Sequence, residues 1–405
     1  MVSCMIELGN KTNCCGCGAC VTACPENALR FEPDENGFLY PSVNELLCIH
    51  CGLCSRVCAY QKKTARGSEK ITYAADASGI KREYSASGGV FAGLAKSFLD
   101  SGGVVFGSVL KYVDGHLRIG HQSISQSEDL LLLQGSKYVQ SAINQTYAEA
   151  RDVLIQGKKV LFSGTPCQIA GLYGFLAKEY ANLYTIDIVC HGVPSEQLFL
   201  DYIRHEEKKL NGKIVDFCFR DKSQGWKLHG KMTVVNGTGE AKALYFEPEE
   251  SSYYQLFLNG YTYRENCYSC PYAGENRMGD LTLGDFWGIE IVQPELLKGN
   301  GGPLDEKEGI SCLIVNTEKG QNLLRQSQNI RVLDSTFEKA QRYNGQLRSP
   351  SQLKPERETV LALYRAGYEK VEKWYKRRLA VVKARRSIRK AIPRPVKKVL
   401  RRMLQ

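Results

Sequence analysis

Residues 14–25 read CCGCGACVTACP, and residues 48–58 read CIHCGLCSRVC. Each run separates three cysteines by two residues and then places a fourth cysteine after three more residues. Three thiolates with this close spacing can bind one 4Fe–4S cluster from a single loop, and the fourth thiolate reaches a second cluster. The two runs therefore predict a domain over residues 1–62 that holds two 4Fe–4S clusters.

The two runs match the ligand pattern of bacterial two-cluster ferredoxins, in which the fourth cysteine of each run binds the other cluster. The second run has Ala59 where the first has Pro25. Structural zinc is an alternative, but zinc sites usually hold two separate C-x2-C pairs rather than this repeated spacing. Cys4 and Cys15 fall outside the pattern and are interpreted as spectators. The expected ligand sets are Cys14, Cys17, Cys20 and Cys58 for one cluster, and Cys48, Cys51, Cys54 and Cys24 for the other.

The composition is typical of a globular protein whose cysteines serve metal or redox chemistry. The chain has 405 residues, is 43% hydrophobic and 24% charged, and contains 16 cysteines. It shows no apolar run long enough for a spanning helix and does not open on a signal peptide, so a cytoplasmic protein is expected. Thiols stay reduced in that compartment, which argues against disulfides.

Basic residues are concentrated at the C-terminus. The formal net charge is +11, and most of it comes from residues 370–405. Apolar residues recur there at helical intervals, so residues 355–405 are expected to form a helical basic tail. Such a helix favours peripheral contact with the inner membrane face or with an acidic partner, and a solvated helix without a partner is the alternative. Nucleic acid is not an expected partner, because no nucleic-acid-binding motif accompanies the charge.

Strand-like and helix-like runs alternate between these two regions. Apolar runs such as KKVLFSG and LYTIDIVC are separated by helical patterns such as TYAEARDVLIQG. The alternation predicts an α/β domain with a mixed sheet over residues 71–345, after a polar linker at residues 61–70. The expected fold is thus an α+β ferredoxin-like two-cluster domain, an α/β domain and a basic C-terminal helix.

Four cysteines of the α/β domain stand where its chemistry is expected. Cys167 and Cys190 each follow a strand, and strand ends carry the chemistry of α/β domains. Cys267 and Cys270 form a separate C-x2-C pair. If the two strands are neighbours, the four thiols can converge on one site. A nucleophilic Cys167 and a two-cysteine redox pair are the alternatives.

Other residues of this region are interpreted as structural. Arg264 and Arg277 flank the C-x2-C pair and are expected in surface ion pairs; the alternative is a cation that raises the reduction potential of a nearby cluster. Four further residues lie in apolar runs and are expected in the core: Cys218, Phe286, Trp287 and Cys312.

Six motifs occur in one order along the chain: SASGGVFAGLAKSFLDSGG, QGSKYVQS, SGTPCQIAGL, IVCHGVPS, YRENCYSCPYA and GDLTLGDFWG. Together they resemble the beta-subunit family of coenzyme F(420) hydrogenases and dehydrogenases. The resemblance implies a flavin-binding α/β domain that passes electrons between clusters, FAD and a deazaflavin. It also implies an oxidoreductase that works with a redox partner protein or a small-molecule acceptor. A third 4Fe–4S cluster is implied on four ligands, Cys167, Cys190, Cys267 and Cys270.

The resemblance implies that three segments line the flavin site. The first places small residues at a helix start, where free amide groups can bind phosphate. The second is a loop with a cation, an aromatic ring and two hydroxyls, and the third is the turn beside Cys167. A serine N-cap with a tight turn is the alternative for the first segment. The implied cofactor-binding residues are Ser87, Gly88, Gly89, Ser136, Lys137, Tyr138, Ser141, Gly164 and Thr165.

The expected function is electron transfer between a ferredoxin-like donor, three 4Fe–4S clusters, FAD and a two-electron acceptor, in either direction. No residue is assigned a catalytic role, and no G-x-G-x-x-G or phosphate-binding lysine loop points to NAD or a nucleoside triphosphate. Two alternatives stay open. One is a membrane-face redox enzyme that acts on a sugar- or lipid-linked substrate, and the other is a non-catalytic electron-transfer subunit that serves as a docking platform.

Overall fold

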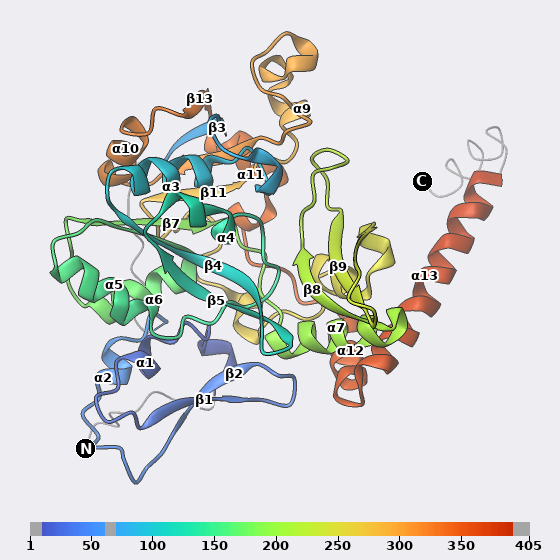
Figure 1. Ribbon diagram of the computed structural model, residues 1–405, viewed down its shortest axis with the longest axis horizontal. Helices are drawn as coiled ribbons and strands as arrows, with labels where there is room; N and C mark the ends of the chain where they lie inside the picture. Colours follow the sequence, from blue (N-terminus) through green and yellow to red (C-terminus); the bar gives the residue numbers. More distant parts are fainter. Residues whose placement is uncertain (1–9, 61–69, 392–405) are drawn as a thin grey trace, which may run out of the picture.

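The computed structural model describes residues 10–60 and 70–391, with side chains up to residue 384. A cysteine-rich N-terminal module lies against a large α/β sheet, and a smaller sheet with long helices completes the molecule (Figure 1). None of the helices in the described residues combines the length and the apolar character that crossing a bilayer requires. Most of the predicted linker, residues 61–69, lies outside the described residues.

The N-terminal module consists of two cysteine loops and one hairpin. Strands β1 (Leu29–Pro33) and β2 (Leu39–Val43) pair in antiparallel fashion. Each cysteine loop runs into a helix of a single turn, α1 (Ala19–Thr22) or α2 (Leu53–Arg56). A glycine with positive φ precedes each of these helices, because the loop must reverse sharply there. The two cysteine runs thus fold into the same local structure.

The large sheet is mixed, as the sequence predicts. Its strand order is β13-β3-β12-β11-β7-β6-β4-β5. The central strands β4, β6, β7 and β11 are parallel, and antiparallel pairs complete both sides. The strands are β3 (Ile71–Ala77), β4 (Val104–Val113), β5 (His116–Ile124), β6 (Val160–Gly164), β7 (Leu183–Ile188), β11 (Leu281–Asp285), β12 (Ser311–Val315) and β13 (Ile330–Ser335).

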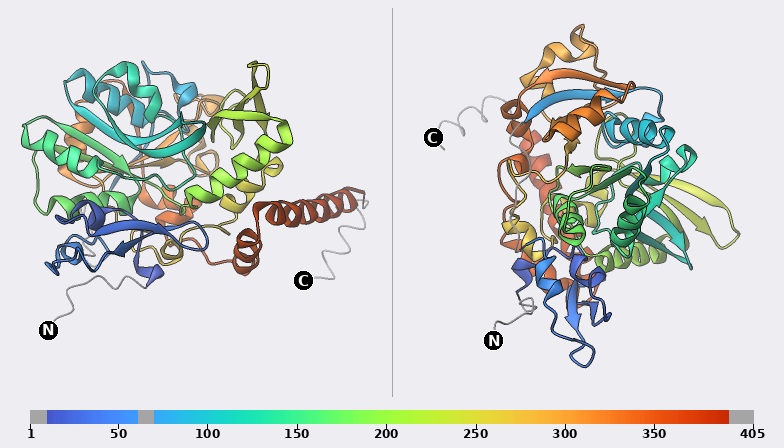
Figure 2. Two further views of the ribbon diagram at one scale, coloured as in Figure 1. Left: turned by 60° about the horizontal axis from the view of Figure 1, so that its bottom comes forward. Right: turned by 90° about the vertical axis from the view of Figure 1, so that its left-hand side faces the viewer.

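Helices cover both faces of this sheet (Figures 1 and 2). One face packs against α3 (Val90–Asp100), α4 (Leu130–Leu133) and α10 (Glu318–Arg325). The other face packs against α5 (Thr146–Ile155) and α6 (Pro166–Leu176). Residues of the N-terminal module, including Cys15 and Cys17, belong to this second core. The module is therefore packed onto the α/β domain rather than attached only through the chain.

A third apolar cluster contains residues of β3 and β12. It includes Phe286 and Cys312, which are fully buried, so the prediction that these two residues are core is confirmed. Helices α9 (Ile289–Val292) and α11 (Phe337–Tyr343) cover this cluster.

A three-stranded antiparallel sheet forms a separate layer beside the large one. It consists of β8 (Gly212–Cys218), β9 (Gly230–Asn236) and β10 (Ala241–Phe246), so the predicted strand KIVDFCF does not join the main sheet. Cys218 ends β8 and is half-buried. Aromatic residues fill the space between this sheet and four helices. The helices are α7 (Glu196–Leu210), α8 (Ser252–Leu258), α12 (Glu356–Arg365) and α13 (Tyr368–Ala391).

Helix α13 starts in this core and then leaves the body of the protein (Figure 2). Val371 and Tyr375 are buried, whereas Val381 and Val382 are 51% and 40% exposed. Only the first half of the helix therefore has apolar contacts among the described residues. The rest of the predicted basic tail, from residue 392, lies outside the described residues.

Candidate redox site

The N-terminal cysteines gather in two groups. Cys20 lies near Cys14 and Cys58, and burial together with the charges of these neighbours raises the pKa of Cys20 to about 12. Cys17 lies on the same loop and is buried against Gly171 of α6. The second group lines a single cavity and consists of Cys24, Cys48, Cys51 and Cys54. Each group thus takes its fourth cysteine from the other run, which is the exchange that the spacing predicts.

The four cysteines of the α/β domain face one another. Strands β6 and β7 are parallel neighbours that pair Gly164 with Asp187, so they end at the same edge of the sheet. Burial, and then the neighbouring thiols, raise the pKa of Cys190 to about 12 and that of Cys270 to about 11. The pKa of Cys267 is raised in the same way, by burial and then by Cys190, Cys167 and Cys270. Two strand ends and the C-x2-C pair thus meet at one place.

An ion pair ties the C-x2-C segment to the end of β7. Arg277 and Asp187 are both buried, and the Nη2 and Oδ1 atoms are 2.7 Å apart. Arg277 also donates to the carbonyl oxygens of Tyr272 and Ile188. The predicted surface ion pair of Arg277 is therefore wrong. The pattern of the sequence placed a cation beside the cysteines but gave no sign that its carboxylate would be buried on β7.

The spacing of the thiols argues against zinc. The sulfurs of a four-thiolate zinc site lie about 3.8 Å apart, because each Zn–S bond is about 2.3 Å long. In the described part of the chain, no three cysteine sulfurs lie within 4.8 Å of one another. Iron–sulfur clusters are held by thiolates, and thiolates are the only donors in this group. These thiols are also spread more widely than one zinc ion allows. The residues present therefore fit a 4Fe–4S cluster.

Cys15 connects the N-terminal module to this group. Its thiol is buried in the same apolar cluster as the Cys17 and Cys167 thiols, and both of these thiols influence its pKa. The hydrogen bond to Cys15, together with burial, raises the pKa of Cys167 well above its usual range. That Cys15 is a spectator rather than a cluster ligand stays a prediction. Cys4 lies outside the described residues.

Arg264 makes a second connection between the two domains. It is fully buried, so the prediction of a surface ion pair is wrong here too. Its guanidinium donates to the carbonyl oxygens of Cys14 and Leu39 and approaches the Cys14 sulfur at 3.5 Å. The nearby Cys14 charge raises the pKa of Arg264 in spite of its burial. A permanent cation therefore stands beside the first cysteine of the N-terminal module.

The three segments predicted to line a flavin lie side by side. Gln134 donates to the Ser85 hydroxyl at 2.8 Å, which joins the second segment to the first. His121 joins the second segment to the third, because its ring contacts the Ser141 hydroxyl at 2.8 Å and the Ser163 carbonyl oxygen at 3.0 Å. Burial lowers the pKa of His121 to about 4, so this histidine is neutral.

Several residues of these segments have structural roles. A side chain at Gly88 would come within 2.6 Å of the Ala75 carbonyl oxygen, and Gly89 begins α3 with a φ of +83°. The tight turn therefore explains both glycines, although Gly89 rather than a serine occupies the N-cap. Ser87 donates to the carbonyl oxygen of Ile310. Other members of the predicted set are likewise engaged: Gly164 packs against Gln168 and His121, Thr165 caps α6, and the Tyr138 ring stacks on Phe257.

Two lysines, one in the second segment and one near the first, have only carbonyl partners among the residues that the structure describes. Lys137 donates to the carbonyl oxygens of Leu132 and Gln134, and burial lowers its pKa to about 7. Lys222 donates to the carbonyl oxygens of Arg82, Ser87 and Glu308, and burial, then Arg82, lower its pKa to about 8. An anion would stabilise both charges, so these residues fit the phosphates of a dinucleotide cofactor. The sequence motifs do not indicate Lys222, because it lies far from them along the chain.

A flat aromatic pair lies near Lys222. The Trp226 and Trp287 rings are stacked with centroids 4.9 Å apart and planes 4° apart. Asp285 accepts from the indole of Trp226 and from the buried guanidinium of Arg220. Trp287 is half-buried, so it belongs only partly to the core that the sequence predicts for it. The guanidinium of Arg220 lies over the Trp287 ring, 5.3 Å from its centre.

Two stretches of the chain match models of known protein families. Residues 13–62 match the family described as 4Fe-4S dicluster domain, and residues 157–338 match the family of the C terminus of the coenzyme F(420) hydrogenase/dehydrogenase beta subunit. The four cysteines of the α/β domain and the third flavin segment lie inside the beta-subunit match. The first two flavin segments, residues 85–89 and 134–141, lie outside it.

Two relatives come from Methanocaldococcus jannaschii. An uncharacterized protein is 23% identical over 348 residues, which cover 79% of this chain and 88% of the relative. The coenzyme F(420)-dependent sulfite reductase is 28% identical over 211 residues, which cover 49% of this chain and only 30% of that enzyme. A chain of the F(420)-reducing [NiFe] hydrogenase complex from Methanosarcina barkeri is 15% identical, with a TM-score of 0.41 over 77% of this chain and 92% of that chain.

Proposed function

We propose that the chain is an electron-transfer subunit of an oxidoreductase, with two 4Fe–4S clusters in its N-terminal module and a third on Cys167, Cys190, Cys267 and Cys270. The observation that carries this proposal is the contact between Cys15 and Cys167. It places the cysteine loop of one domain directly against the thiol group of the other. A bound cluster supplies one-electron chemistry.

The residues around this contact would keep water out of the space between the two thiol groups. Cys15, Cys17 and Cys167 share one apolar cluster with Tyr147 and Tyr272. The Tyr272 hydroxyl donates to the carbonyl oxygen of Ala59 in the N-terminal module, and the Tyr147 hydroxyl donates to that of Gln168. Both tyrosines thus use their polar atoms elsewhere and present ring carbon to the contact, which lowers the local dielectric.

We further propose that FAD binds where the three loop segments meet. Lys137 and Lys222, whose pKa values are lowered by burial, would hold its phosphates, and the half-buried tryptophan pair offers an aromatic surface near Lys222. When bound, a flavin supplies the conversion between one-electron and two-electron transfer. The names of the family and of the sulfite reductase both contain coenzyme F(420), a deazaflavin, which suggests a deazaflavin as the acceptor.

A non-catalytic relay is the second candidate, and one observation favours it. The hydroxyls of Ser87, Ser141 and Thr165 already have protein partners, so a flavin would have to displace them or bind elsewhere. In this case the chain would pass electrons to a partner protein without a flavin of its own. We also propose that the protein is cytoplasmic and that its basic tail contacts the membrane surface.

Anaerobic purification separates these candidates. Iron, sulfide and flavin are counted per chain, and reduction of a deazaflavin is then followed optically. The proposal predicts about twelve iron atoms for three clusters, together with bound FAD. Twelve iron atoms without flavin would support the relay. About eight iron atoms, the number for two clusters, would remove the third cluster and with it the proposed route.

A further inference from the structure

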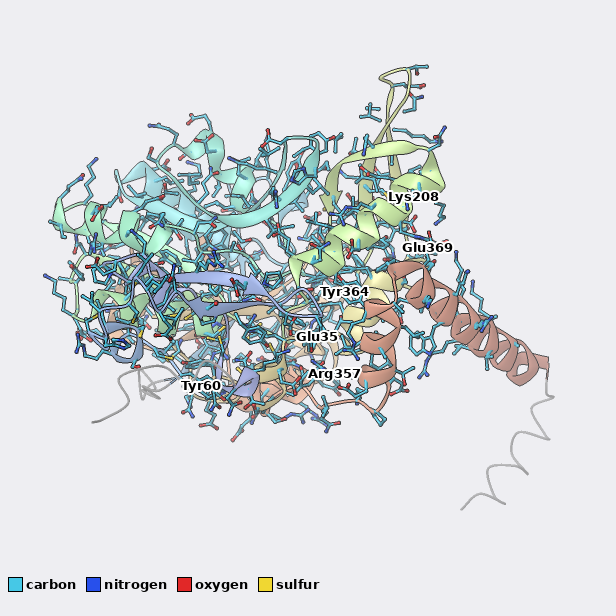
Figure 3. The ribbon with its side chains drawn as sticks, turned by 90° about the horizontal axis from the view of Figure 1, so that it is seen from below. Glu35, Tyr60, Lys208, Arg357, Tyr364 and Glu369 are labelled. Atoms are coloured by element: carbon cyan, nitrogen blue, oxygen red, sulfur yellow. The ribbon has the colours of Figure 1, made fainter. Side chains whose placement is uncertain are left out.

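A group of metal-ligating side chains lies far from the cysteines, where α13 packs against α7. His205 and Glu206 belong to α7, and Glu372 belongs to α13. One ligand atom from each side chain lies within 4.8 Å of the other two. Figure 3 shows the junction of the two helices, where Lys208 of α7 and Glu369 of α13 lie on its outer side.

Two buried polar atoms of this group have no partner among the described residues. Glu206 and Glu372 are each only 6% exposed. The Oε2 atom of Glu372 and the Nε2 atom of His205 are buried, and neither has a hydrogen-bond partner in the described residues. Buried carboxylate and imidazole atoms usually have a partner, so two such atoms in one group indicate a missing ligand.

The neighbouring residues do not supply that ligand. Tyr202 and Tyr368 pack beside the group, but their hydroxyls bond to Ser251 and Ser252. The Tyr368 ring lies 5.8 Å from the ring of His205 and closes one side of the group. The enclosure is therefore aromatic, and the polar atoms inside it face one another.

Two lysines balance the carboxylates from outside. Lys209 binds the Oε2 atom of Glu206 at 2.8 Å, and Lys376 binds the Oε1 atom of Glu372 at 3.1 Å. Their side chains are 50% and 60% exposed, so both can turn into water at little cost. Neither lysine reaches the free Oε2 atom of Glu372.

We propose that His205, Glu206 and Glu372 bind a divalent metal ion that joins α13 to α7. One imidazole and two carboxylates are ligands for Mn²⁺ and Zn²⁺, with water in the remaining positions. The ion fixes the start of the helix that carries the basic tail. This site is independent of the proposed electron-transfer function.

Manganese is the probe, because the thiol sites of the chain prefer softer metals. The full-length protein, purified anaerobically, is dialysed to equilibrium against MnCl₂, and bound manganese is measured by elemental analysis. The wild type is expected to bind one Mn²⁺ per chain. Glu372→Gln and His205→Gln, which keep the side-chain volume, are expected to weaken this binding by at least about tenfold.

Glu369→Gln is the matched control, because Glu369 is an exposed carboxylate on the same helix. It should bind Mn²⁺ like the wild type. Lys376→Met should bind more tightly, because the competing cation is removed. Equal binding by the wild type and Glu372→Gln, with iron content and melting temperature unchanged, would overturn the site. The proposed site would also be overturned if Mn²⁺ did not raise the melting temperature of the wild-type protein.

Discussion

The guanidinium of Arg264 lies 4.0 Å from the centre of the Tyr40 ring. Arg264 comes three residues before Cys267, whereas Tyr40 belongs to β2 of the N-terminal module. No carboxylate pairs with this arginine in the described part of the chain. Its charge is balanced by carbonyl oxygens, by the tyrosine ring and by the Cys14 sulfur. The two domains are therefore joined through a buried cation that stands beside a predicted cluster ligand.

Replacing Arg264 by glutamine should lower the reduction potential of the cluster that Cys14 is proposed to bind. A cation beside a cluster stabilises its reduced, more negative state. Loss of one charged hydrogen bond of about 1.5 kcal/mol corresponds to about 65 mV for a one-electron couple. Potentiometric titration followed by electron paramagnetic resonance measures the shift. Arg30→Gln, at a site that is 77% exposed, is the control and should leave the potential unchanged. An equal potential in Arg264→Gln would contradict the role of this cation.

Replacing Arg277 by methionine should destabilise the protein strongly. Arg277 and Asp187 are both fully buried, and removal of one partner leaves an unpaired charge, at a cost of about 3–5 kcal/mol. Thermal unfolding measures the loss. Arg204→Met breaks an exposed pair with Asp201 and should cost less than about 1 kcal/mol. If the two variants melt at the same temperature, the buried pair does not hold the cysteine segment in place.

Flavin binding should weaken as the pH rises. The pKa of Lys222 is lowered to about 8 by burial and by Arg82, so its charged form is lost above that pH unless an anion stabilises it. A phosphate pairs only with the protonated amine, and therefore affinity should fall between about pH 7 and about pH 9. Fluorescence titration with FAD measures this slope.

Two variants test the assignment of that slope to Lys222. Lys222→Met should bind FAD more weakly at pH 7 and should lose the fall in affinity around pH 8, while the fall near pH 7 that Lys137 causes should remain. Lys227→Met changes an exposed lysine of the same loop and should behave like the wild type. An unchanged slope in Lys222→Met would show that another group causes it.

Removing residues 380–405 should abolish membrane binding without unfolding the protein. The truncation keeps Val371 and Tyr375, which are buried in the body, and removes the exposed basic part of α13. Each cation near an anionic bilayer contributes about 1 kcal/mol, so the full chain should sediment with vesicles that contain phosphatidylserine. Neutral phosphatidylcholine vesicles are the control. Equal sedimentation of the truncated chain would refute the role of the tail.

Local spacing predicted the two N-terminal cysteine groups and the mixed sheet. The meeting of Cys167 with Cys190 also followed from the sequence, because both residues come directly after strands that turn out to be parallel neighbours. Such features depend on contacts within a few residues or on a general property of α/β sheets.

Contacts between distant segments could not be predicted in this way. Arg264 and Cys14 are separated by 250 residues, and nothing local distinguishes a buried arginine from a surface one. Cys15 contacts Cys167 only because the N-terminal module packs under α6. In the flavin segments, a glycine at position 88 suits both a phosphate-binding turn and a plain tight turn, and only the structure shows that Ala75 leaves no room for a side chain there. The sequence marks a small residue but not the neighbour that requires it.

The iron content of single cysteine variants tests the third cluster most directly. Wild type and Cys218→Ser, which changes a half-buried thiol outside the group, should each hold about twelve iron atoms per chain. Cys267→Ser should hold about eight, with the spectra of the two N-terminal clusters unchanged. Full iron content in Cys267→Ser, or about eight iron atoms in the wild type, would contradict the assignment of Cys167, Cys190, Cys267 and Cys270 to one cluster.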